Sequence, residues 1–281
     1  MRFRLYREHG ALNSVPVFNA FEQGVKSLGH EIVTSGEDVS VIWSVLWHGR
    51  MASNRAIYEK CIRENIPIII IEVGNLKRNH LWRVCLNHIN RLGIFSNTEQ
   101  LDTHRPEKLG VELRPLLTDR RGEILIATQH ESSLQWSGMP TMRVWTENTI
   151  AEIKKHTNRR IVVRPHPRSP FPVKIPGVLL DSPRRVPNTY DDFNIFYNYH
   201  CVINYNSGPA VQAAIQGVPI ICDSSSLAGE LSLKLENIES PILPDRTEWF
   251  LKLCHTEWTV DEISQGIPLQ RLLPKIVEQI S

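Results

Sequence analysis

Three short polar segments each follow a predicted apolar strand, and their residue types suit the binding of an anion. They are Gln129, Ser132 and Ser133 after the strand 124–128, Arg164 and His166 after the strand 160–163, and Asn206, Ser207 and Gly208 after the strand 201–204. In an open α/β sheet, ligands bind beyond the carboxyl ends of the strands. We therefore expect these residues to line one edge of a sheet. His130, within the first segment, is expected to be structural or solvent-facing.

The segment VINYNSGPAVQAAIQGVPII (202–221) predicts a strand, a tight turn, a helix and a second strand. Ser207 suits a helix N-cap, Gly208 lets a ligand approach the backbone, and Pro209 suits the first helical turn. The N–H groups and dipole at such a helix start bind phosphate. Arg164 would add a bidentate contact and His166 a further donor. The alternative is a routine capped junction, but RPHP on a neighbouring strand favours a diphosphate site.

A carboxylate ends the most apolar strand of the first half of the chain, IPIIIIE (66–72). Glu72 is a candidate general base, because a strand end followed by Gly74 is where a site is expected. The competing interpretation is an ion pair with Lys77 or Arg78. Glu8 and His9, after the first strand, are rival candidates for the base.

Strands alternate with helices throughout the chain, which is typical of parallel sheets with right-handed crossovers. The predicted fold class is α/β, with two Rossmann-like domains facing a central cleft. The expected domains are 1–116 and 117–268, with a helix at 269–281 packing back on the first. The pattern also predicts helices over 80–93 and 190–199.

Composition excludes several classes of protein. A net charge of +2 does not demand a polyanionic partner, and no apolar run is long enough to span a membrane. Five scattered cysteines and a charged amino terminus indicate a cytoplasmic protein. The fingerprints G-x-G-x-x-G, G-x-x-x-x-G-K-[ST] and G-x-S-x-G are absent, which disfavours a nicotinamide dehydrogenase, a P-loop nucleotidase and an α/β-hydrolase.

As an ordered set, RPHPRSP (164–170), the segment 202–221 and GEILIATQHESSLQW (122–136) resemble the donor half of GT-B glycosyltransferases. The set is most similar to the capsule-polysaccharide, Kdo-transferase-like family. The segment IEVGNLKR (71–78) also resembles the E-D-G-x-L-R segment of that family. Val73 departs from it, since the family has an acidic residue there. The resemblance implies a nucleotide-sugar donor, with Arg164, His166 and the Ser207 helix start stabilising the leaving diphosphate. Without a D-x-D loop, no catalytic metal and no further cofactor are expected.

The short chain is also similar to small phage-type glycosyltransferases that modify hydroxymethylated pyrimidines in DNA. That resemblance implies transfer of a hexosyl group from UDP-glucose to 5-hydroxymethylcytosine in double-stranded DNA, in the host cytoplasm if the protein is phage-encoded. Lys77, Arg78 and Arg83 would then contact DNA phosphates. The alternatives are a capsule or lipopolysaccharide glycosyltransferase, a nucleotide-sugar 2-epimerase, and a non-catalytic nucleotide-sugar binding protein.

Overall fold

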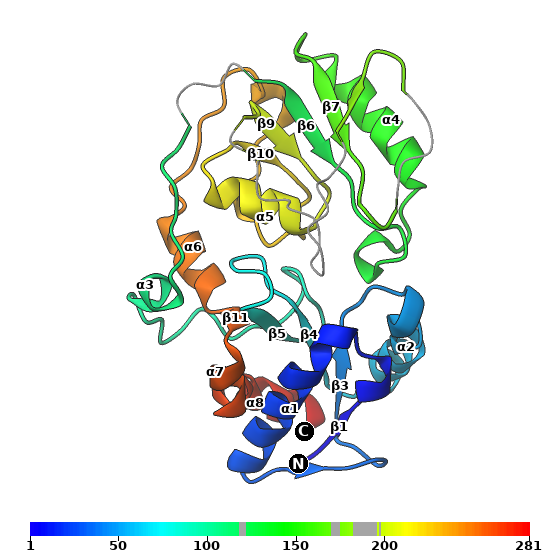
Figure 1. Cartoon of the computed structure of the whole chain (residues 1–281), viewed down its shortest axis with the longest axis vertical. Helices are drawn as coiled ribbons and strands as arrows, with labels where there is room; N and C mark the ends of the chain where they lie inside the picture. Colours follow the sequence, from blue (N-terminus) through cyan, green and yellow to red (C-terminus); the bar gives the residue numbers. More distant parts are fainter. Residues whose placement is uncertain (118–121, 170–174, 182–195, 197) are drawn as a thin grey trace. The chain divides into compact units, whose positions relative to one another are not determined.

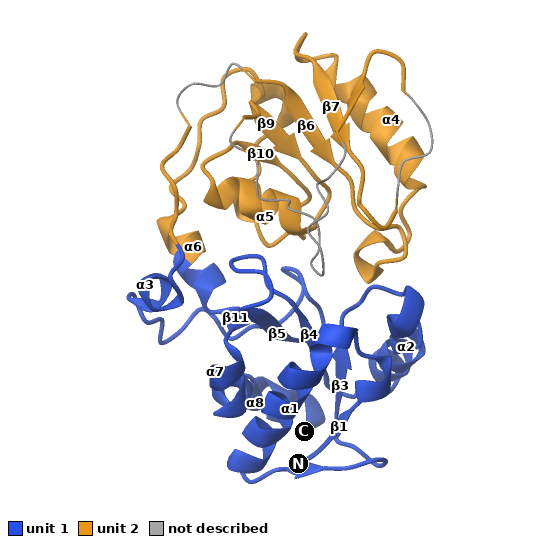
Figure 2. Cartoon of the chain, viewed as in Figure 1, with its two compact units in different colours: residues 1–111, 251–281 blue, residues 112–250 orange. Residues whose placement is uncertain are grey.

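The computed structural model describes residues 1–117, 122–169, 175–181, 196 and 198–281. The chain forms two compact α/β units, shown in Figure 2. Unit 1 combines Met1–Val111 with Leu251–Ser281, and unit 2 is Glu112–Phe250. Unit 2 is therefore an insertion within unit 1. The helix expected over 190–199 falls largely on residues outside this description.

Unit 1 contains a six-stranded sheet in the order β11-β5-β4-β3-β1-β2. Its strands are β1 (Arg2–Leu5), β2 (Glu31–Ile32), β3 (Val39–Trp43), β4 (Ile68–Val73), β5 (Trp82–Leu86) and β11 (Glu257–Trp258). Its helices are α1 (Val15–Ser27), α2 (Asn54–Glu64), α3 (Arg105–Leu109), α7 (Val260–Ser264) and α8 (Ile267–Ile280). Strands β1 to β4 are parallel and β5 is antiparallel to both β4 and β11. The parallel strands place the residues that follow β1, β3 and β4 at one edge.

The helix expected over 80–93 is wrong, because this segment contains β5. Every residue of β5 is buried, and the strand lies between β4 and β11 in the sheet. A strand that is buried on both faces has no period-two alternation of exposed and buried positions to distinguish it from a buried helix.

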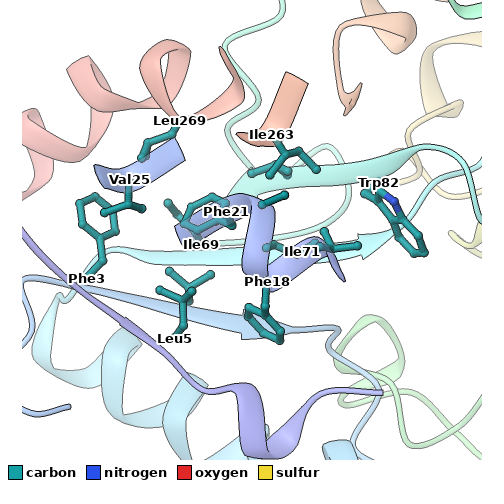
Figure 3. Close-up of a cluster of buried hydrophobic side chains, with 14 of the residues drawn as sticks. Phe3, Leu5, Phe18, Phe21, Val25, Ile69, Ile71, Trp82, Ile263 and Leu269 are labelled. Carbon is teal, nitrogen blue, oxygen red and sulfur yellow. The ribbon is translucent and has the colours of Figure 1, made fainter. Parts of the chain in front are cut away.

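The carboxyl-terminal segment completes unit 1. Strand β11 pairs with β5, and Leu269, Leu272 and Ile276 of α8 lie in the same core as Phe3 and Phe21. Figure 3 shows Ile263 of α7 and Leu269 of α8 in one cluster with Phe21 and Val25 of α1. The second unit boundary therefore precedes the expected position at 268, because β11 and α7 belong to the sheet and core of unit 1.

A capping box begins α7 and supplies a measurable contribution to the stability of unit 1. The Thr259 side chain accepts a hydrogen bond from the Glu262 N–H, and the Glu262 carboxylate accepts one from the Thr259 N–H. Replacing Thr259 with alanine is expected to lower the free energy of unfolding by about 1 kcal/mol, because a first-turn N–H loses its acceptor. Urea unfolding would measure this change. Thr259→Ser keeps the hydroxyl and should unfold like the wild type, whereas an unchanged Thr259→Ala midpoint would contradict the assignment.

Unit 2 contains a five-stranded parallel sheet in the order β10-β9-β6-β7-β8. Its strands are β6 (Ile124–Ala127), β7 (Ile161–Arg164), β8 (Leu179–Leu180), β9 (Cys201–Ile203) and β10 (Ile220–Ile221). Its helices are α4 (Met142–Ile153) and α5 (Gly208–Ile215), and the unit boundary falls within α6 (Thr247–Cys254). Figure 1 labels β6, β7, β9 and β10 of this sheet, together with α4 and α5. The direction of strand connection reverses between β6 and β9, which is the topological switch point where α/β sheets bind ligands.

Among the described residues, no helix has both the length and the apolar character needed to cross a membrane.

Candidate functional site

The switch point of unit 2 brings together Gln129, which follows β6, and Asn206, which follows β9. Gln129 Nε2 donates to Asn206 Oδ1 at 3.2 Å, and the Asn206 N–H donates to Gln129 Oε1 at 3.1 Å. Gln135 Nε2 also donates to the Asn206 carbonyl at 2.8 Å. Both Gln129 and Asn206 are buried. Their amide groups hold the ends of two strands together.

The start of α5 lies at the same edge. The helix begins at Gly208 with Pro209 in its first turn, as the sequence predicts. Ser207 is the N-cap residue, as the sequence predicts, but its side chain makes no capping hydrogen bond. The Ser207 side chain instead bonds to Asn204, whose Nδ2 donates to Ser207 Oγ at 2.9 Å. Asn204 also accepts from the Ser207 N–H at 2.8 Å. Ser207 therefore gives no acceptor to the first-turn N–H groups of α5, which suits a site for an external anion.

Arg164 ends β7 with a buried and largely occupied guanidinium group. Its Nε donates to Asp181 Oδ2 at 2.8 Å, and its Nη2 donates to the Tyr199 hydroxyl at 3.2 Å. Nη1 is buried and has no hydrogen-bond partner among the described residues. Burial raises the pKa of Tyr199, so the phenol keeps its proton and donates to Asp181 at 3.3 Å. Only Nη1 therefore remains for the phosphate contact that the sequence predicts for Arg164, in place of the two nitrogens of a bidentate contact.

His166 and His130 form a pair at the ends of β7 and β6. Their rings meet edge to face, with centroids 5.4 Å apart and an interplanar angle of 77°. Nδ1 of His130 accepts from the Ser132 N–H at 3.1 Å, and Nδ1 of His166 accepts from the Arg168 N–H at 3.2 Å. In each neutral imidazole the proton is therefore on Nε2, which makes that nitrogen a donor.

The remaining predicted residues of unit 2 have local structural contacts. Ser133 accepts from the Gln135 N–H and caps the turn Leu134–Trp136, and Ser132 contributes its N–H to His130. His130 is buried, not solvent-facing, and its ring contact with His166 is one that the sequence does not predict. In both histidines, Nδ1 accepts a hydrogen bond from the backbone N–H of the residue two positions later in the chain. The sequence does not reveal these bonds.

In unit 1, Glu72 lies near the carboxyl end of β4 and is partly buried. Its Oε2 accepts from the Ser44 hydroxyl at 2.6 Å, and its Oε1 accepts from the Val73 N–H at 2.9 Å. Ser44 directly follows β3, the strand beside β4. Lys77 donates instead to the Leu109 carbonyl at 3.3 Å. The Ser44 hydroxyl and the Val73 N–H leave the Glu72 carboxylate with further lone pairs that can accept a proton.

Glu8 and His9 lie in the turn that follows β1, so they share the carboxyl edge of the parallel strands with Glu72. Their side chains approach to 4.0 Å, and Glu8 is exposed. Asn54 Nδ2 donates to the Trp43 carbonyl at 2.6 Å and to the His9 carbonyl at 3.4 Å. Asn54 thereby ties together the ends of β3 and β1.

The prediction that Arg83 contacts DNA phosphates is wrong, because its guanidinium group is buried in unit 1. Arg83 lies 3.5 Å from the buried carboxylate of Glu257 and donates to the Ile89 carbonyl at 3.1 Å. Glu257 also accepts from the N–H groups of Asn75 and Leu76. A Cβ at Gly74 would lie only 2.4 Å from this carboxylate, so only glycine fits there.

Lys77 is exposed and Arg78 is partly buried in the loop that Glu257 holds. Within the described part of the chain, no group of three or more His, Cys, Asp or Glu side chains is placed to hold a metal ion.

No protein-family model matches this sequence, and no curated protein is similar to it at a significant level. Solved structures do match. The chain superposes on the KpsC beta Kdo 2,4 transferase of Thermosulfurimonas dismutans with a TM-score of 0.54, 11% identity, and coverage of 100% of this chain and 98% of that chain. For the beta Kdo 2,7 transferase of KpsC from the same organism, the TM-score is 0.50 at 15% identity, covering 96% and 99% of the two chains. The expected fold class, GT-B with two Rossmann-like domains, is thus confirmed.

Proposed function

We propose that this protein is a glycosyltransferase that binds a nucleotide-sugar donor at the carboxyl edge of the sheet in unit 2. The observation that carries the proposal is that three donors lie at the carboxyl ends of β7 and β9, two strands of the same parallel sheet. These are Arg164 Nη1, His166 Nε2 and the uncapped start of α5. Such donors suit a phosphate that gains charge as the sugar leaves.

The proposed reaction assigns a task to each unit. The acceptor oxygen forms a bond to the anomeric carbon while the bond from that carbon to the phosphate oxygen breaks. The electron pair of the broken bond goes to the phosphate, where Arg164 and His166 stabilise it. The proton of the acceptor hydroxyl goes to the Glu72 carboxylate, which acts as general base. No step in this scheme needs a metal ion.

The charge balance around Arg164 bears on the choice of donor. Asp181 already offsets the guanidinium charge, with 2.8 Å between the two groups. A site with less net positive charge favours a single phosphodiester over the diphosphate of UDP-glucose, the donor expected from the sequence. Two solved structures that share the fold are named as Kdo transferases, which makes Kdo the candidate sugar. We place it on a cytidine monophosphate carrier, as CMP-Kdo, because a CMP-linked sugar presents a single phosphodiester.

Thermal denaturation with a panel of donors tests this preference. CMP-Kdo is expected to raise the melting temperature progressively with concentration, because a ligand that binds only the folded state stabilises it by about 2.7 kcal/mol at 100 times its Kd. UDP-glucose should give a smaller shift, and Arg164→Ala should abolish the shift with either donor. A larger shift with UDP-glucose would restore the diphosphate assignment.

The acceptor has two candidates. A glycan hydroxyl is preferred, because the burial of Arg83 removes one of three cationic groups that the DNA hypothesis requires. Exposed Lys77, in the loop that follows Glu72, keeps 5-hydroxymethylcytosine in DNA as the second candidate. Incubation of the preferred donor with a capsule-type oligosaccharide or with hydroxymethylated duplex DNA, followed by mass spectrometry, separates them. A sugar mass gained only by the DNA would reverse the preference.

The same assay without any acceptor tests the other two classes. A 2-epimerase would convert the donor or release its nucleotide with no acceptor present. A non-catalytic binding protein would raise its melting temperature with the donor and transfer nothing to any acceptor.

A further inference from the structure

Ser44 has a backbone conformation that is unusual for a residue with a side chain. It directly follows β3 and has a φ of +63°, in the left-handed region. It is 4% exposed, and its N–H still donates to the Ile71 carbonyl of β4 at 2.8 Å. Glycine adopts this conformation without the steric cost that a Cβ brings, so a serine here is strained. Strain of this kind persists where the surrounding structure holds it, often at functional sites.

The Ser44 hydroxyl donates one hydrogen bond and accepts another, and the bond that it donates goes to Glu72. It donates to Glu72 Oε2 at 2.6 Å and accepts from the Leu46 N–H at 3.2 Å. The accepted bond fixes the rotation of the hydroxyl, so its hydrogen points at the carboxylate. A hydrogen bond between a hydroxyl and an ionised carboxylate is among the short and strong ones.

Glu72 is therefore held from two sides. Ser44 holds Oε2 and the Val73 N–H holds Oε1 at 2.9 Å. A carboxylate has about four lone-pair sites, so two stay available after these bonds. The two bonds select one rotamer of a side chain that would otherwise sample several.

We propose that Ser44 is a positioning residue for Glu72, holding the carboxylate in the orientation that takes the proton from the acceptor hydroxyl. This inference rests on the proposed function. It explains why a strained serine occupies a position where glycine would fit better, since glycine would leave Oε2 without its donor. Ser44 does not touch the reacting atoms in this scheme and acts only through Glu72.

Ser44→Gly tests the proposal because it separates the hydroxyl from the backbone strain. The variant should keep or raise the melting temperature, because the left-handed conformation suits glycine. Its kcat should nevertheless fall about tenfold to a hundredfold, as expected when a reacting group loses its orientation. The KM for donor should stay unchanged, since the donor residues lie in unit 2. Asn65→Gly is the matched control, because Asn65 also has a positive φ, of 54°, at the end of α2. It should keep the wild-type kcat.

A double-mutant cycle with Glu72→Gln makes the test specific. If Ser44 acts through Glu72, adding Ser44→Gly to Glu72→Gln should cause no further loss of kcat. Equal losses in the two backgrounds, or a stable Ser44→Gly variant with wild-type kcat, would overturn the positioning role while leaving the proposed function in place. A wild-type protein that transfers no sugar from any donor would instead overturn the proposed function, and this inference with it.

Discussion

Replacing Glu72 with glutamine is expected to lower the rate of sugar transfer by about 10²- to 10⁴-fold while donor binding stays intact. Glutamine has nearly the shape of glutamate, and its Oε1 can still accept from the Val73 N–H or the Ser44 hydroxyl. Its amide cannot take up the proton of the acceptor hydroxyl. Because the proposed donor contacts lie in unit 2, the donor-induced rise in melting temperature should match that of the wild type.

Glu8→Gln is the appropriate control for this result. Glu8 lies at the same edge of the sheet, and its side chain is 56% exposed. Its loss should change the transfer rate by less than about twofold, because a solvated carboxylate elsewhere on the edge holds no fixed position relative to the acceptor. A normal rate in Glu72→Gln together with a large loss in Glu8→Gln or His9→Gln would move the base to the turn after β1.

The second large effect is expected at His166, where two substitutions separate the two ring nitrogens. In His166→Asn, Oδ1 can replace Nδ1 as acceptor for the Arg168 N–H, so the loop should keep its conformation. The donor at the Nε2 position is lost, and transfer should slow by about 10²- to 10³-fold. In His166→Gln, the side-chain amide can reach the Nε2 position and should restore part of the rate. Steady-state kinetics on both variants would measure the difference.

The result that would contradict this assignment is equally specific. If His166→Asn transfers at the wild-type rate with an unchanged melting temperature, the imidazole serves the loop alone. If both variants lose activity equally and also melt earlier, the ring is needed for its packing against His130.

Local sequence signals predict the elements of the candidate site well. The Gly208-Pro209 pair marks the beginning of α5, and the apolar runs before Glu72 and Arg164 mark β4 and β7. These signals are local, because turn residues and continuous apolar runs act through the nearby backbone. The same signals place the candidate residues at the carboxyl ends of parallel strands.

Contacts between distant residues limit the rest of the prediction. Arg83 reads as a surface cation, but its partner Glu257 is 174 residues away in sequence, and no local pattern shows that pairing. Asp181 occupies Arg164 in the same way across 17 residues. Ser207 makes no side-chain capping hydrogen bond, because its hydroxyl bonds to Asn204. In each case a competing hydrogen-bond partner in the folded protein changes what a correctly identified residue can do.

The insertion of unit 2 within unit 1 fixes an order of assembly during synthesis on the ribosome. Residues 112–250 emerge as one continuous segment and can fold as they appear, whereas residues 1–111 still lack β11, α7 and α8. Until those elements emerge, one edge of β5 lacks its partner strand β11, and Arg83 lacks the carboxylate of Glu257. The unit whose first strand leaves the ribosome earliest is thus the last to reach its native state, and a nascent chain stalled after Phe250 exposes its unfinished sheet to chaperones and proteases.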